Sequence, residues 1–278
     1  MVNKNKTEMS FMDHLEDLRW LLIRSTIAIL IMAFVAYFFI DFIFDDIIFG
    51  AKDPDFITYH FFCEITKFFN IEDSTACATE FSFIIQNTNV GGQFSIFLWT
   101  CITAGFILGF PYLLYEIWKF ISPALYEKER KNARSFVIVS SLLFFIGVLF
   151  GYYIIVPLSV NFFGTFIVSQ TIINQFSVDS YISMVKTSLI ASGLVFELPI
   201  IIYFLAKVGL VTPELLRNYR KFAVVGILII AAIVTPPDIV SQIITSIPIL
   251  ILYEVSIFIA ARVAKNRLKN EQSSQRIQ

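Results

Sequence analysis

Residues 110–134 read FPYLLYEIWKFISPALYEKERKNAR, and the order of residue types in this stretch indicates the class of fold. The stretch begins in an apolar run, passes through an aromatic patch, turns at Ser122 and Pro123, and ends in a charge cluster over residues 127–134. In membrane proteins apolar side chains enter the hydrocarbon, aromatic rings gather at the headgroups, and Lys and Arg collect on the cytoplasmic side. The stretch is therefore typical of the cytoplasmic end of a membrane span. Its aromatic patch consists of Tyr112, Tyr115, Trp118 and Phe120.

Composition supports the same class. Hydrophobic residues make up 57% of the chain and charged residues 15%, and the mean hydropathy is +0.74. Soluble domains carry about 25% charged residues, so the chain is expected to be an all-α integral membrane protein. Its 278 residues leave room for several spans of about 20 residues, and no linker divides them, so we expect one domain.

Six apolar runs are candidate membrane helices. The connection over residues 41–93 holds nine acids against Lys52 and Lys67, and Pro157 is expected to end the third span. The fourth span contains Lys186 near its start and Glu197 in its interior. The expected spans are residues 20–40, 94–117, 137–156, 184–206, 222–234 and 239–260, followed by a tail over residues 261–278.

The fifth run is the shortest, and Pro236 and Pro237 separate it from the sixth. Thirteen residues at about 1.5 Å each do not cross a hydrocarbon core of about 30 Å. The two runs are therefore either two short spans or one re-entrant hairpin. We favour two short spans, because Lys and Arg flank both outer ends, whereas the turn between them carries only the charge of Asp238.

The basic residues predict the orientation. The N-terminal segment with the start of the first span, the second-to-third connection, the fourth-to-fifth connection and the tail hold 18 of the 21 Lys and Arg residues. Lys and Arg favour the cytoplasmic side, so both termini and the tail are expected there and residues 41–93 outside. An even number of spans agrees with this orientation.

The motifs of soluble enzymes are missing from this sequence. It contains no GxxxxGK[ST] or GxGxxG phosphate-binding motif, no CxxC pair, and only two histidines, His14 and His60. We therefore expect no catalysis, cofactor or metal. Cys101 lies within a span as a packing residue, whereas Cys63 and Cys77 lie in the acidic outer connection, where a disulfide and two free thiols remain alternatives.

Carboxylates in two places allow two interpretations each. Glu16, Asp17, Glu127 and Glu129 can form exposed ion pairs with neighbouring Lys and Arg, such as Glu16 with Arg19, or they can form a binding site. Glu197 is different, because a charge at the centre of a bilayer costs about 2.5 kcal/mol or more. We interpret Glu197 as a functional residue, with a structural hydrogen bond as the alternative, and place Lys186 and Glu254 nearer the ends of their runs.

Four motifs together resemble the TatC family, the multi-spanning receptor of the twin-arginine protein translocation system. They are HLEDLR at residues 14–19, FPYLLYEIWKFISPALYEKER at 110–130, FELP at 196–199 and TPPDIVSQ at 235–242. Two departures accompany the resemblance. The family usually has Glu where Asp17 stands, here with Glu16 beside it. The first outer connection is also longer than usual and lacks the proline that often follows span one.

The resemblance implies a function and site residues. Asp17 or Glu16, together with Glu129, would receive the Arg-Arg pair of a signal peptide, supported by Arg19 and Phe120. It also implies a concave, glove-like bundle, export of folded proteins driven by the proton gradient, homo-oligomers, and single-span TatA- or TatB-type partners in a bacterial inner membrane. Glu197 would face the concavity and meet a partner. The structural residues would be Pro111, Pro123, Pro236, Pro237, Asp238 and Gln242.

Two other functions compete with this one. In a secondary transporter, Glu197, Lys186 and Glu254 would form a proton or substrate relay. An inverted repeat should place similar broken spans in both halves, and only the second half has short ones. The other alternative is a purely structural membrane scaffold, which composition permits.

Overall fold

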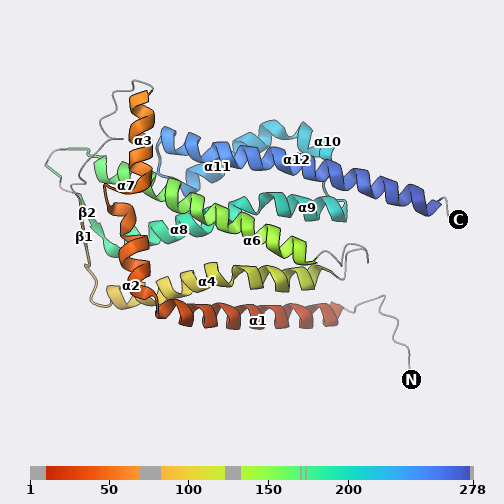
Figure 1. The fold of residues 1–278 in the computed structure, drawn as a ribbon, viewed down its shortest axis with the longest axis horizontal. Helices are drawn as coiled ribbons and strands as arrows, with labels where there is room; N and C mark the ends of the chain where they lie inside the picture. The colour runs from red at the N-terminus through yellow and green to blue at the C-terminus, as the bar shows by residue number, and fades with distance from the viewer. Residues whose placement is uncertain (1–10, 69–82, 123–132, 170, 173, 276–278) are drawn as a thin grey trace. The chain divides into compact units, whose positions relative to one another are not determined.

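The computed structural model describes residues 11–68, 83–122, 133–169, 171–172 and 174–275 (Figure 1). Most of these residues are helical, and five of the described helices are long and apolar enough to cross a membrane. The described chain forms two compact units, residues 1–39 with 98–141 and residues 40–97 with 142–278. The count of six spans, the orientation and the single domain stay predictions.

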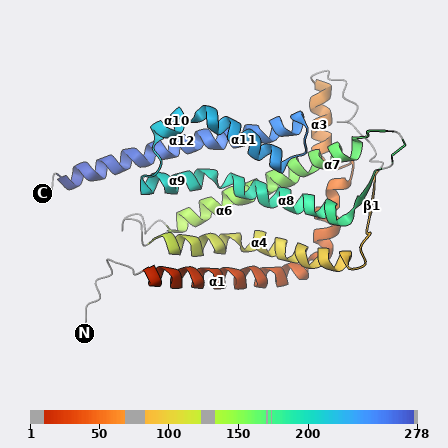
Figure 2. The same ribbon diagram turned by 180° about the vertical axis from the view of Figure 1, so that it is seen from behind.

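The first unit is built on two long helices, α1 (Phe11–Tyr37) and most of α4 (Gly92–Ile121), which lie side by side in Figures 1 and 2. Their backbones approach closely at Gly105, where an added Cβ would lie 2.5 Å from the Ala33 nitrogen. Lipid supplies no hydrophobic force to join membrane helices, so they associate through close packing. Small residues permit this packing because they let the two backbones approach. Pro111 lies inside α4, within the second span as predicted.

The first connection contains several short helices and a strand within its described residues. It contains α2 (Ile40–Phe42), the π-helix η1 (Ile43–Ile48), the 3₁₀-helix η2 (Gly50–Lys52), α3 (Ile57–Phe68) and the strand β1 (Ile84–Gln86). The Tyr59 hydroxyl lies 2.9 Å from the carbonyl oxygen of Ala51 and 3.3 Å from that of Pro157. Burial raises the pKa of Tyr59 well above its ordinary value, so the phenol stays a donor.

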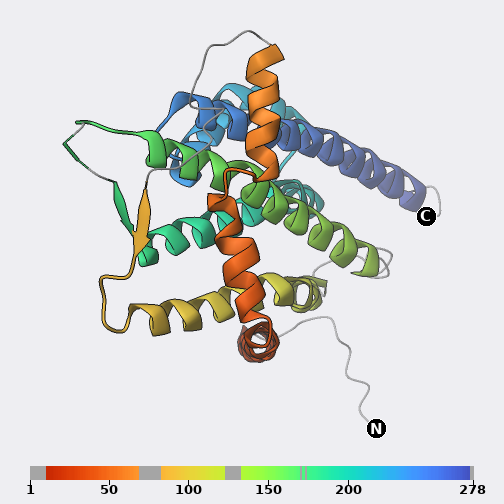
Figure 3. The same cartoon turned by 60° about the vertical axis from the view of Figure 1, so that its left-hand side comes forward.

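The third span is longer than predicted, and the expectation that Pro157 ends it is wrong. Helix α6 (Ala133–Phe150) continues through the π-helix η4 (Gly151–Ile155) into α7 (Val156–Thr165). Pro157 lies in the first turn of α7, where its missing N–H and fixed φ are tolerated. The chain then enters β2 (Gln175–Ser177), which pairs in parallel with β1, beginning with Ile84 beside Gln175 (Figure 3). These two short strands are absent from the all-α prediction.

The fourth span is divided into α8 (Val178–Phe196) and α9 (Leu198–Val208), and Glu197 lies at the junction rather than inside one helix. Pro199 explains the break, because it lacks an N–H and its ring clashes with the carbonyl group four residues earlier. Helix α9 ends at Gly209, whose φ of 87° is a left-handed conformation that favours glycine.

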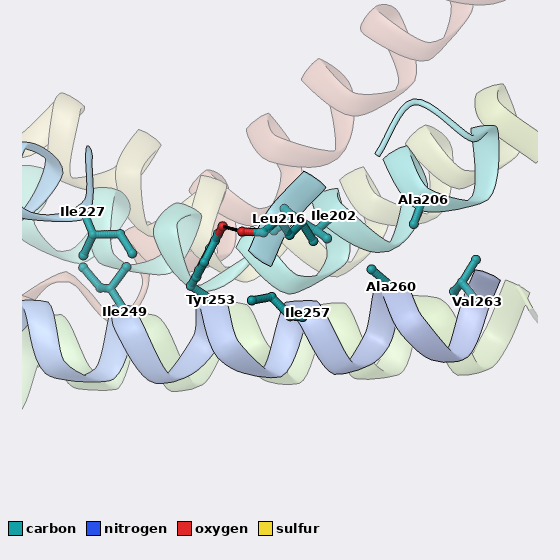
Figure 4. Close-up of a cluster of buried hydrophobic side chains, with 9 residues drawn as sticks. All are labelled: Ile202, Ala206, Leu216, Ile227, Ile249, Tyr253, Ile257, Ala260 and Val263. Carbon is teal, nitrogen blue, oxygen red and sulfur yellow. Dashed lines mark hydrogen bonds between the residues drawn. The ribbon is translucent and has the colours of Figure 1, made fainter. Parts of the chain in front are cut away.

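The chain ends in three helices, α10 (Pro213–Asn218), α11 (Arg220–Val234) and α12 (Ile239–Gln275). Helix α11 is short, as predicted, whereas α12 continues through most of the expected tail because no helix breaker follows residue 260. The Tyr253 hydroxyl donates to the Leu216 carbonyl at 2.8 Å and ties α12 to α10. Figure 4 shows the buried cluster that joins α9 to α12, namely Ile202, Ala206, Leu216, Ile227, Ile249, Tyr253, Ile257, Ala260 and Val263.

Candidate functional site

The beginning of α1 lies beside the end of α4. The rings of His14 and Phe120 stack with centroids 4.3 Å apart and an interplanar angle of 24°. This contact brings the motif at residues 14–19 beside the described part of the motif at residues 110–130. Glu129 and Pro123, the other predicted residues of this region, lie outside the described residues.

Glu16, Asp17 and Arg19 are exposed on the first turns of α1. Successive residues of an α-helix are about 100° apart, so Asp17 lies about 60° around the helix from His14, whereas Glu16 lies about 160° away. Asp17 is therefore on the side of α1 that carries the contact with Phe120. The alternative ion pair of Glu16 with Arg19 is not formed among the described contacts.

A buried acid in α4 was missed by the sequence analysis. Glu116 is 4% exposed, the Tyr112 hydroxyl donates to its Oε1 at 3.0 Å, and Arg24 Nη1 lies 3.6 Å from its Oε2. The Arg24 guanidinium also lies 5.7 Å from the centre of the Trp20 ring. A signal was present, because charged residues inside predicted spans are rare and usually paired, and both Arg24 and Glu116 lie inside predicted spans.

Glu197 is 6% exposed at the junction of α8 and α9. Its backbone carbonyl accepts hydrogen bonds from the N–H groups of Ile200 and Ile201, at 2.9 and 3.0 Å, and so starts α9. Glu197 therefore lies where the regular helical hydrogen bonding of α8 ends and that of α9 begins. Its predicted role as a functional residue that meets a partner stays a prediction.

Glu254 and Lys186, the other residues of the alternative relay, lie in different surroundings. Glu254 Oε2 lies 2.6 Å from Arg220 Nη2, and both side chains are about half exposed. Lys186 is half-buried in α8. Glu254 thus pairs with the basic start of α11, an ion pair that the sequence analysis did not predict.

The turn between α11 and α12 carries the TPPDIVSQ motif. Asp238 directly precedes α12, and its Oδ2 accepts from the Ser241 N–H at 2.7 Å, as a helix cap does. Gln242 Nε2 donates to the Leu228 carbonyl at 3.1 Å and thereby joins α12 to α11. Pro236 and Pro237 lie in the turn between the two helices, and the structural roles expected for all four residues stay predictions.

The two cysteines within the described residues differ in their state. Cys101 is a buried free thiol in α4, as predicted, and Cys63 of α3 is disulfide-bonded. Cys77 lies outside the described residues, so the Cys63–Cys77 pairing stays a prediction. Within the described ranges no three His, Cys, Asp or Glu side chains gather in a way that could hold a metal ion.

Comparisons with known proteins agree on one family. The family profile described as Sec-independent protein translocase protein (TatC) matches residues 13–248. The TatC protein of Blattabacterium sp. subsp. Periplaneta americana is 42% identical over 266 residues, covering 96% of this chain and 100% of that protein. The Aquifex aeolicus TatC protein is 35% identical over 260 residues, covering 93% of this chain and 98% of that protein.

Solved structures give the same result. The structure described as "Crystal Structure of Twin Arginine Translocase Receptor- TatC in DDM" has a TM-score of 0.67 at 34% sequence identity, and the match covers 89% of this chain and 99% of that chain. The family profile and the relatives each cover most of the chain. The chain therefore belongs to the TatC family of Sec-independent protein translocase proteins and is a multi-pass membrane component of a bacterial translocase.

Proposed function

We propose that this chain is the receptor that binds the Arg-Arg pair of twin-arginine signal peptides at its cytoplasmic face. The observation that supports it best is the stacking of His14 on Phe120 at 4.3 Å, which holds the acids of α1 beside the end of α4. The charged segment that contains Glu129 follows α4 in the sequence. In this proposal one peptide meets carboxylates from both motifs.

The chemistry of the peptide matches these groups. A guanidinium is planar and always charged, and its N–H groups bind both oxygens of a carboxylate, which a lysine ammonium cannot reproduce. Asp17 takes one arginine because it lies on the Phe120 side of α1, and Glu129 takes the other. Arg19 and Glu16 flank this site, and Phe120 supplies an apolar surface for the peptide backbone or side chains.

The later steps of transport involve partners. Glu197 is a buried acid at a helix junction, where it can accept a hydrogen bond from a polar group on a single-span TatA- or TatB-type protein. Such partners, further copies of this chain and the proton motive force would together move folded proteins across a bacterial inner membrane. The chain itself performs no catalysis in this proposal.

Site-specific photocrosslinking tests the binding site. A photoreactive residue at position 129 should crosslink to an Arg-Arg signal peptide, and unlabelled peptide should compete. A probe at Leu210, which is 68% exposed beyond α9, serves as the control and should give little product. Equal crosslinking from both positions, or none from position 129 with a bound peptide, would refute the site.

A further inference from the structure

The ion pair between Arg24 and Glu116 lies inside the first unit, where charged side chains within membrane spans are rare. The Glu116 side chain is 5% exposed and the Arg24 side chain 42% exposed, and both lie within candidate membrane spans. Arg24 comes from α1, whereas Tyr112 and Glu116 come from α4, four residues apart on one face. The Tyr112 hydroxyl donates to Oε1 of Glu116, whereas the Arg24 guanidinium lies beside Oε2.

The pair depends on one alignment of α1 against α4. The two helices run antiparallel, since His14 meets Phe120 at one end and Ala33 meets Gly105 at the other. Between these ends, a Cβ added at Gly109 would lie 3.7 Å from the Ile29 Cα. A shift of one helical turn, about 5.4 Å, would remove Arg24 from Glu116 and leave a buried carboxylate without its cation.

We propose that Arg24 and Glu116 are positioning residues that fix the register of α1 against α4 and thereby set the place of Asp17 relative to Phe120. Glu116 lies one turn before Phe120 in α4, so the register of this pair is transmitted over a short distance to the stacking contact. The close approach at Gly105 joins the two helices through backbone atoms of uncharged residues. The ion pair adds the charge that makes one register lower in free energy than its neighbours.

The effect on peptide binding rests on the proposed function, whereas the effect on register does not. Arg24→Gln leaves the buried carboxylate unpaired and should change the register most. Glu116→Gln should change it less, because Arg24 is partly exposed and can be solvated. The double variant Arg24→Gln with Glu116→Gln removes both charges and keeps amide hydrogen bonding, so it should recover much of the native register.

Disulfide trapping in membranes measures the register directly. With Cys101 replaced by Ser, the pair Ile29→Cys and Gly109→Cys reports the native register, and Ile29→Cys with Leu113→Cys reports a shift of one turn. Arg24→Gln should lower the first yield and raise the second, and the double variant should restore the first. Arg220→Gln with Glu254→Gln, which removes the other Arg–Glu pair of the described residues, is the matched control and should change neither yield.

Signal-peptide affinity is the second readout. Arg24→Gln should bind an Arg-Arg signal peptide about tenfold more weakly, or about 1.4 kcal/mol, and the double variant should regain most of this. Native trapping yields in Arg24→Gln would overturn the inference, and so would a double variant as altered as Arg24→Gln. If Arg24→Gln fails to accumulate in membranes, the trapping yields of Glu116→Gln and of the double variant decide whether the ion pair fixes the register. A wild-type chain that binds no peptide would refute the proposed function, while the trapping yields still decide the register.

Discussion

His14 stacks on Phe120 with ring centroids 4.3 Å apart, so an aromatic contact joins the two motifs that the proposed binding site requires. Removing the ring in Phe120→Ala should weaken Arg-Arg signal-peptide binding and loosen the start of α1, because an aromatic pair contributes about 0.5–1.5 kcal/mol beyond burial. Phe120→Tyr keeps the ring and should bind nearly as the wild type does. Titration of a fluorescent signal peptide against the purified protein measures both, and equal affinity in all three proteins would contradict the role of the stack.

Glu197 should act after signal-peptide binding. Glu197→Ala should retain peptide affinity and lose transport or recruitment of single-span partners, because the side chain that accepts a hydrogen bond is gone. Glu197→Gln keeps hydrogen-bonding ability without charge and should lose less. Transport into inverted vesicles and co-purification of the partner measure the two steps. If Gln is as inactive as Ala while recruitment is intact, a proton relay replaces the docking role.

Gly105 should tolerate no side chain. Its added Cβ would lie 2.5 to 2.8 Å from backbone atoms of Ile29 and Ala33, so Gly105→Ala should push α1 from α4 and cost about 1–3 kcal/mol. Gly226 of α11 is the control, because a Cβ there meets nothing within 4 Å. Thermal unfolding in detergent should show a lower midpoint for Gly105→Ala only. A midpoint unchanged in both would mean that the close approach is absent in the membrane.

The orientation predicts a labelling pattern. Glu64 in α3 and Glu214 in α10 are both exposed, and the basic residues predict that they lie on opposite sides of the membrane. An impermeant thiol reagent should therefore label Glu64→Cys in intact cells and Glu214→Cys only after lysis, in a background without the free Cys101. The reverse pattern would show that the termini are outside.

Five of the predicted spans coincide with helices that are long and apolar enough to cross a membrane, because long apolar runs with charged flanks are local features of the sequence. Their interruptions were not predictable, as two prolines show. Pro157 lies in the first turn of a helix that continues a π-helix, whereas Pro199 follows a break at Glu197, although both prolines lie within apolar runs. Which outcome occurs depends on how the preceding turn packs.

The candidate site was predictable only in part. HLEDLR and the residues after Phe110 carry local signals, so Asp17 and Phe120 could be named as candidates, and the family resemblance implied that the two motifs lie close together. The Arg24–Glu116 pair depends on which residues of two antiparallel helices face each other. Neither the close contact at Gly105 nor the facing of Arg24 and Glu116 is revealed by the spacing of residues within either helix.

The proposed function requires that carboxylates on the Phe120 side of α1 bind a pair of arginines. The most direct measurement is the affinity of the purified protein for matched signal peptides with Arg-Arg or Lys-Lys, in the wild type, Asp17→Asn and Glu16→Gln. The wild type should prefer Arg-Arg by about tenfold, since lysine lacks the planar fork. Asp17→Asn should lose most of that preference and Glu16→Gln should keep it. Equal binding of both peptides by the wild type, or an undiminished preference in Asp17→Asn, would contradict the claim.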